Sequence, residues 1–134
     1  MNNKIFTEIK SENQLKYETD EFSFILKPSK IAGVGCFATH AIAKGTRLRV
    51  FNGGNRTFSI KEANNTPVLK KFCDFFGVID GDKFITAGNF SAMAVGWYMN
   101  HCDDFNAHHD EGYKYFASRN IKAGEEITID YNEL

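Results

Sequence analysis

A sequence pattern that occurs twice constrains the fold more than any other feature of this chain. The first copy is Phe37–Leu48 (FATHAIAKGTRL) and the second is Phe116–Ile127 (FASRNIKAGEEI). In each copy an apolar strand leads to an isoleucine, then to a glycine that can adopt positive φ, and then to an alternating strand. Two copies do not make a solenoid. The pattern therefore predicts two related strand–turn–strand units that bracket a compact, pseudo-symmetric β fold.

Length and composition favour a single domain that is mostly β with short helices. A chain of 134 residues can bury one core. Its aromatic content of 14%, which includes 13 Phe, favours strands and a dense interior. Residues 1–20 are polar and charged with little periodicity, so we expect an amino-terminal arm there and the domain over residues 21–134.

Local patterns predict the elements that lie outside the two copies. They are a strand over Phe22–Leu26 that exits at Pro28, a helix capped at Ser59–Glu62, a helix from Thr66-Pro67 through Phe72 that Gly77 can stop, a hairpin over Val78–Ile85 with Asp80-Gly81 at its turn, and helical turns within Ser91–Met99.

Charge, hydropathy and cysteine content argue against several classes of protein. The net charge of -1, from 16 basic and 17 acidic residues, provides no cationic field for a phosphate backbone, so we expect no direct nucleic-acid binding. No apolar run is long enough to cross a bilayer, and the first residues lack a signal peptide, so we expect no membrane association. Cys36, Cys73 and Cys102 are odd in number and far apart, which predicts reduced thiols in an intracellular protein.

Three short segments carry the chemistry of the sequence. They are Ala32–Gly35 (AGVG), Met99–Ala107 (MNHCDDFNA) and Glu125–Tyr131 (EEITIDY). Each is weak alone, but their order and spacing together resemble the SET domain family from about Ser29 to Tyr131. The resemblance implies a β-clip fold of small sheets with a pseudoknot-like carboxy-terminal segment, as in small viral and bacterial SET proteins. The expected intracellular location is the cytoplasm, or the host nucleus if the protein comes from a virus or an intracellular bacterium.

The resemblance implies S-adenosylmethionine as the cofactor and assigns five residues to it. The backbone at Ala32, Gly33 and Val34 corresponds to the family's cofactor-binding strand, and glycine without Cβ permits a close approach to a ligand. Asn100 corresponds to the family's asparagine, whose short side chain offers an amide and a carbonyl to the methionine moiety. His101 follows with backbone bonds to the adenine and its ring held in the surrounding core. A core histidine without a ligand is the alternative.

Tyr131 takes the position of the family's catalytic tyrosine, which implies methyl transfer to a lysine side chain of a protein or peptide such as a histone. A phenol suits that step, because it is protonated at neutral pH and can orient an amine through its dipole. A strand-end aromatic without a catalytic role is the alternative. Ile129 is expected on the same strand face, in the substrate channel, where its small side chain implies di- or trimethylated product.

The sequence departs from the family pattern in two respects. Cys102 stands where the family has Ser and Phe105 where it has Pro, and the lost hydroxyl bears on cofactor affinity. The sequence also ends soon after Tyr131, without the family's usual closing segment for the lysine channel. We expect that segment to be replaced by Tyr17 and Phe22 of the amino-terminal part or by a second subunit, as in a homodimer.

Two other interpretations stay open. The N, O and S donors of Asn100–Glu111 could form a metal site, but they lack zinc-site spacing, so we favour a solvated acidic loop and expect no metal. A SET-fold binding module that does not turn over is the alternative to an enzyme, because fold alone does not separate them. The sequence identifies neither the substrate protein nor its lysine.

Overall fold

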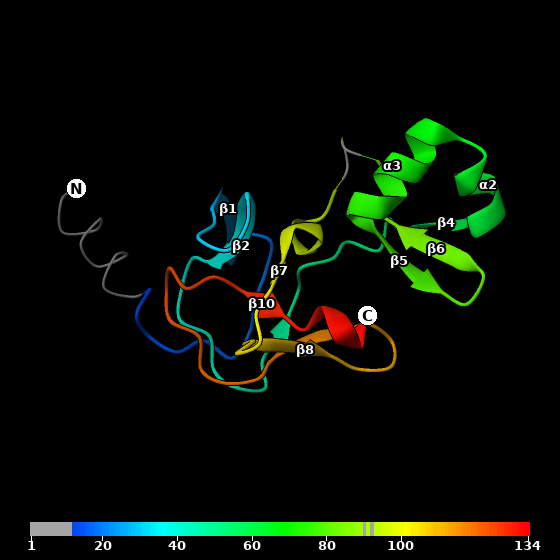
Figure 1. Ribbon diagram of the computed structural model, residues 1–134. Coiled ribbons are helices and arrows are strands. Elements are labelled where there is room, and N and C mark those ends of the chain that lie inside the picture. Colours follow the sequence, from blue (N-terminus) through cyan, green and yellow to red (C-terminus); the bar gives the residue numbers. More distant parts are fainter. Residues whose placement is uncertain (1–11, 90, 92) are drawn as a thin grey trace. The chain divides into compact units, whose positions relative to one another are not determined.

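The computed structural model describes residues 12–89, 91 and 93–134, and these fall into two compact units (Figure 1). The first, here called the repeat unit, combines the described residues up to Val50 with Tyr98–Glu133. The second, here called the inserted unit, is Phe51–Trp97 together with the last residue, Leu134. No helix among the described residues is long and apolar enough to cross a membrane.

The two copies of the repeated pattern pair with each other across the repeat unit. Ile42 and Ile121 exchange two backbone hydrogen bonds of 2.8 Å. The Gly45 N–H donates to the Ala117 carbonyl at 2.8 Å, and the equivalent Gly124 N–H donates to the Ala38 carbonyl at the same distance. Both glycines have positive φ, +85° and +83°. The predicted pseudo-symmetry is confirmed, and its form is an exchange in which each copy's turn pairs with the other copy's first strand.

Equivalent apolar positions of the two copies form the centre of this unit's core. Ile42 and Ile121 are 0% and 1% exposed, and the equivalent pair Leu48 and Ile127 are 2% and 0% exposed. Burial of one such side chain is worth about 2 kcal/mol. The repeat therefore places at least four large apolar side chains where they stabilise both copies at once.

The repeat unit consists of small sheets, as the family resemblance implies. In the first sheet, β1 (Phe24–Pro28) is antiparallel to β2 (Val34–Ala38). The second sheet has three strands in the order β3 (Arg47–Leu48), β9 (Tyr115–Ala117) and β8 (Ala107–His109). In the third sheet, β10 (Thr128–Ile129) is parallel to β7 (Asn100–His101). A 3₁₀ turn, η3 (Tyr131–Glu133), follows β10. The prediction of a mostly β fold with short helices is confirmed.

The first strand begins two residues later than predicted. The Asp20 carboxylate accepts from the Phe22 N–H at 2.8 Å, and the Ser23 hydroxyl accepts from the Asp20 N–H at 2.9 Å. This local turn takes Phe22 out of the strand, because short polar side chains compete with the sheet for backbone hydrogen bonds. Pro28 accordingly is the last residue of β1.

Residues 12–20, the described part of the predicted arm, contact the repeat unit. The Lys16 N–H donates to the Ala41 carbonyl at 3.0 Å, and the Thr19 hydroxyl donates to the Arg47 carbonyl at 2.6 Å. Thr19 is buried. Residues 1–11 of the predicted arm lie outside the described residues, and the boundary at residue 20 stays a prediction.

The inserted unit contains the predicted helices and hairpin. Its elements are β4 (Arg56–Ser59), α2 (Ile60–Asn64), α3 (Pro67–Phe76), β5 (Gly77–Asp80), β6 (Lys83–Thr86) and most of η2 (Val95–Tyr98). Ser59 caps α2 by accepting from the Glu62 N–H at 3.0 Å, whereas Thr66 caps α3 without a side-chain bond. The helix α3 extends beyond the predicted Phe72 and ends where Gly77 lets the next strand pass close to the Cys73 carbonyl, which a Cβ would approach to 2.7 Å.

Candidate functional site

The side chain of Asn100 joins its own segment to the other two segments that the sequence singled out. Its amide nitrogen lies 3.1 Å from the Ala32 carbonyl oxygen, 3.3 Å from the Val34 carbonyl oxygen and 2.9 Å from a Glu126 carboxylate oxygen. All three neighbours are acceptors, which fixes the NH₂ group on this side of the residue. Among the residues that the structure describes, none bonds to the Asn100 Oδ1 atom, so that oxygen remains available as an acceptor.

Two glycines shape the strand segment that faces Asn100. Gly33 has a φ of +47°, and no described atom lies within 4 Å of the place where its Cβ would stand. Gly35 is different, because a Cβ there would collide with the Glu126 carboxylate and lie 3.1 Å from the Ser29 Cβ. The first glycine thus permits the turn of the backbone, and the second admits a carboxylate beneath it.

Glu126 and Ser29 complete this network, and sequence reasoning gave neither a role. The Ser29 hydroxyl lies 2.7 and 2.9 Å from the two Glu126 carboxylate oxygens, and it accepts from the Ile31 N–H at 3.0 Å. Glu126 belongs to the third motif, but its partners lie 26 and 97 positions away. Only the position of Ser29 at the start of the family resemblance hinted at its part.

The phenol of Tyr131 contacts the segment that carries Asn100. Its hydroxyl donates to the carbonyl of Met99, the residue before Asn100, at 2.8 Å. Its backbone N–H donates to the His101 Nδ1 atom at 3.0 Å, and the two rings are 5.4 Å apart. The residue is 49% exposed while its hydroxyl bond is partly buried. The residues around Gly33, Asn100 and Tyr131 therefore meet in one place.

The pKa of the Tyr131 phenol is raised above its ordinary value. Burial is the main cause, and the negative charge of Glu126 adds to it. A hydrogen bond from the His101 backbone lowers the pKa and so opposes these two effects. A raised pKa keeps the phenol protonated at neutral pH, where it can donate a hydrogen bond and cannot serve as a base.

Two expectations about this region are wrong in their geometry. β10 ends at Ile129, and Tyr131 lies in the following 3₁₀ turn, so the two side chains do not share a strand face. Ile129 is 5% exposed, and its carbonyl accepts from the Cys102 N–H at 3.1 Å. The His101 side chain is 33% exposed instead of held in the core. The assignment of Ile129 to a substrate channel stays a prediction.

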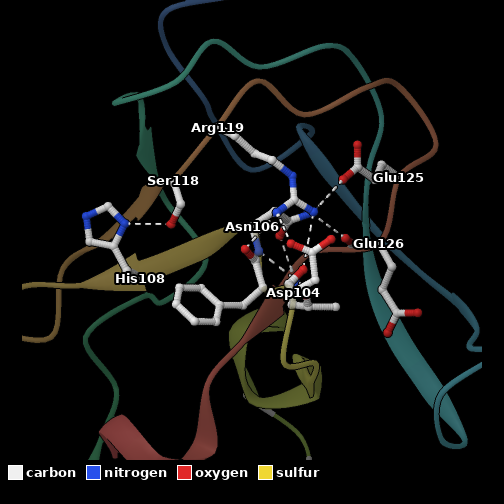
Figure 2. A network of polar contacts seen from close by, with 9 residues as sticks. Asp104, Asn106, His108, Ser118, Arg119, Glu125 and Glu126 are labelled. Carbon is white, nitrogen blue, oxygen red and sulfur yellow. Dashed lines mark hydrogen bonds and ion pairs between the residues drawn. The ribbon is translucent and has the colours of Figure 1, made fainter.

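Asn106, the second asparagine of the central motif, is a buried structural link (Figure 2). It is 1% exposed. Its amide nitrogen donates to the Glu125 carboxylate at 2.9 Å and to the Glu126 carbonyl at 2.8 Å, and its Oδ1 accepts from the Thr128 N–H at 2.8 Å. Arg119 reaches the same Glu125 carboxylate at 3.8 Å. Asn106 thereby fixes the segment that carries Glu126 against the central motif.

Two histidines of the central segment have protein partners. The His108 Nδ1 atom lies 2.8 Å from the Ser118 hydroxyl, and the ring of its neighbour His109 faces two backbone carbonyls. Within the described part of the chain, no group of three or more His, Cys, Asp or Glu is placed to hold a metal ion.

Tyr115 lies on the strand next to His109, and its pKa provides a test of how the side chains of this region pack. Burial raises its pKa to about 12, and the nearby Tyr113 and Glu133 contribute. Because the ordinary value is 10.0, the folded chain holds this proton more tightly than the unfolded chain. Its contribution to stability is complete below pH 10 and is lost as the pH rises toward 12. Spectrophotometric titration should show one of the five tyrosines ionising near pH 12, a step absent from Tyr115→Phe. Equal curves for both proteins would contradict this prediction.

Comparison with known proteins agrees with these motifs. The sequence pattern of the SET domain family matches residues 33–132. Among curated proteins, none matches the chain. One similar solved structure, at 18% identity and a TM-score of 0.57, is a Plasmodium falciparum protein named as a candidate histone methyltransferase; the match covers 81% of this chain and 92% of that chain.

Two further similar structures are of a Polycomb Repressive Complex 2. One is a humanized mutant from Chaetomium thermophilum with a bound inhibitor, at 23% identity and a TM-score of 0.60, and the other is an apo form with two substitutions, at 23% and 0.63. Each match covers 81% of this chain but only 14% and 15% of those chains. Likeness at this identity shows the fold, and the family match spans most of the sequence. The chain belongs to the SET domain family.

Proposed function

We propose that this chain is a protein-lysine methyltransferase that uses S-adenosylmethionine. The observation that carries the proposal is the convergence on two consecutive residues: Asn100 holds the Ala32–Val34 segment through its side chain, and the carbonyl of Met99 holds the Tyr131 phenol. One neighbouring structure is of a protein named as a candidate histone methyltransferase, which supports a protein substrate.

The residues around Asn100 fit the methionine end of such a cofactor. S-adenosylmethionine supplies an electrophilic methyl group on a sulfonium sulfur. The unbonded Oδ1 of Asn100 is an acceptor for an ammonium group, and the carboxylate of Glu126, 2.9 Å from the amide nitrogen, favours a cation nearby. The open space at Gly33 leaves backbone groups of the Ala32–Val34 segment accessible to a ligand.

Tyr131 would act by orientation. Its phenol is protonated and held on the Met99 carbonyl, so its oxygen presents lone pairs at a fixed place. An incoming lysine must first lose a proton, which costs about 4 to 5 kcal/mol at pH 7 for a reference pKa of about 10.4. Oxygen dipoles that align the resulting amine, in a site poor in water, would be the protein's contribution to the rate.

The partners and location of the protein are part of the same proposal. We infer a protein or peptide substrate with a target lysine, histones being the first candidates. Tyr17 and Phe22 are 75% and 78% exposed, and we propose that they close the lysine channel. Closure by a second copy in a homodimer, and an intracellular location, are also proposed.

The proposal is tested by binding and transfer measured separately. Calorimetry with S-adenosylmethionine should show one site per chain, and incubation with histones and cell lysate should add methyl groups to lysine by mass spectrometry. Di- or trimethylated product would support the role of Ile129 as a small channel residue. Binding without transfer would favour a binding module, and a chain that neither binds nor transfers would reject the proposal.

Gly35→Ala should weaken binding of S-adenosylmethionine about tenfold or more. The new Cβ would push the Glu126 carboxylate away from Asn100, and a charged hydrogen bond of this kind is worth about 1.5 to 3 kcal/mol. The measurement is the calorimetric Kd.

The control for this prediction is Gly112→Ala. Its new Cβ would lie 3.5 Å from the Asp110 carboxylate, an ordinary contact, so its Kd should match wild type. A Gly35→Ala protein with wild-type affinity would show that the Glu126 network has no part in cofactor binding.

A further inference from the structure

The short turn that carries Tyr131 is held at both ends by histidines. At its start, the Tyr131 N–H donates to the His101 Nδ1 atom at 3.0 Å. At its end, the Glu133 carbonyl oxygen lies 3.0 Å from the His109 Nε2 atom. His101 ends β7 and His109 ends β8, so two separate strands fix η3.

The bond at the start of the turn requires a neutral His101. Nδ1 must keep its lone pair to accept from the Tyr131 N–H, and Nε2 faces the Asp103 carboxylate at 3.0 Å, where it donates. The neutral ring with its proton on Nε2 satisfies both partners. Protonation of Nδ1 would set two donors against each other, and the Asp130 carboxylate, 3.7 Å away, would compete for the new N–H.

The bonds at the end of the turn require a protonated His109. Its Nδ1 lies 2.7 Å from the Asp110 carbonyl oxygen and its Nε2 lies 3.0 Å from the Glu133 carbonyl oxygen. Carbonyl oxygens only accept, and a neutral imidazole has one N–H, so both bonds form together only on the imidazolium. The neutral ring must give up one of them.

The surroundings of His109 leave its ring accessible to solvent protons. Its ring stacks on Tyr113 at 4.8 Å and meets Tyr115 at 5.3 Å. It also borders an open hollow whose other titratable members are His108, Asp110, Glu111 and Glu133.

We propose that His101 and His109 are positioning residues with opposite proton requirements, which together hold Tyr131 in place only over an intermediate range of pH. Each requirement concerns which ring nitrogens carry a proton, so a change in the protonation of either ring removes a hydrogen bond that holds the turn. The catalytic consequence rests on the proposed methyltransferase function, whereas the effect on the turn does not.

Substitution by Asn or Gln tests the two nitrogens of each histidine ring one at a time, because an amide side chain can replace one of them and does not titrate. The terminal atoms of Asn reach the place of Nδ1, and those of Gln reach the place of Nε2. At position 101, His101→Asn should therefore keep an acceptor for the Tyr131 N–H and His101→Gln should lose it. At position 109 the order reverses: His109→Gln should keep a donor to the Glu133 carbonyl, and His109→Asn should lose it.

The test is the pH dependence of the Tyr131 amide signal in protein labelled with ¹⁵N-tyrosine, which has five such residues. The signal should move in wild type between pH 5 and 8.5, lose the acid part of that movement in His101→Asn, and lose the alkaline part in His109→Gln. A wild-type signal that stays still over this range, or variants that move as wild type does, would overturn the proposal. This readout needs no methyl transfer, so it stands or falls separately from the proposed function.

Activity provides the second readout. At each pH, kcat of His101→Gln should be about tenfold below that of His101→Asn, and kcat of His109→Asn about tenfold below that of His109→Gln, with KM unchanged. Tenfold corresponds to the loss of one hydrogen bond of about 1.4 kcal/mol. Ionisation of the substrate amine is common to each pair and cancels in the ratio. Equal kcat within each pair would contradict the positioning role.

Discussion

Replacing Tyr131 with Phe should lower kcat for lysine methylation about 100- to 1,000-fold while the Kd for S-adenosylmethionine changes less than about threefold. The substitution removes only the hydroxyl that is held on the Met99 carbonyl at 2.8 Å and leaves the ring against His101. Loss of one preorganised polar group aimed at a reacting centre commonly has an effect of this size. The measurements are single-turnover transfer and calorimetric binding on the same preparation.

Tyr113→Phe is the matched control for this prediction. Tyr113 is also partly exposed, at 40%, and its ring stacks on His109 in either form. Its kcat should stay within about twofold of wild type. A Tyr131→Phe protein as active as this control would remove Tyr131 from the catalytic machinery and leave the binding-module interpretation.

Asn106→Ala should lower the free energy of unfolding by about 3 to 5 kcal/mol. The truncation leaves the Thr128 N–H and the Glu126 carbonyl without their partner in a region where Asn106 is 1% exposed. Each buried polar group left without a hydrogen bond costs about 1 to 3 kcal/mol. Since whole domains are stable by about 5 to 15 kcal/mol, this one change should bring the chain close to unfolding. Urea denaturation gives the value.

The control is Asn120→Ala at the surface of the same unit. Its Oδ1 accepts from the Lys44 N–H at 2.8 Å, but both groups are exposed and water can replace the bond. The expected loss is below about 1 kcal/mol. Similar losses for the two variants would show that Asn106 does not anchor the third motif.

The repeated pattern made much of the repeat unit predictable. Apolar residues at Ile42, Leu48, Ile121 and Ile127 and glycines at the turns recur in order, and these are the residues that the fold buries or turns. The pattern did not reveal that each copy pairs with the other, because pairing between distant segments depends on chain topology and not on local propensity. The start of β1 was misplaced for a local reason, the turn closed by Asp20.

The site was predictable as far as its motifs extended. The sequence brought Gly33, Asn100 and Tyr131 to attention, and the structure places their segments together. Glu126 had no predicted role, since its link to Asn100 spans 26 positions. The histidines that hold η3 could not be found either, because their meaning lies in which ring nitrogen faces a donor and which faces a carbonyl.

The central claim is that the segments around Gly33, Asn100 and Tyr131 form one pocket for the cofactor. Calorimetric titration of S-adenosylmethionine into wild type and Asn100→Ala, with folding of both checked by circular dichroism, tests it most directly. We predict saturable one-site binding to wild type and at least about 100-fold weaker binding to the variant, because the substitution removes the Oδ1 acceptor and frees the Ala32–Val34 segment. Equal affinity of the two folded proteins, or no binding to wild type, would contradict the claim.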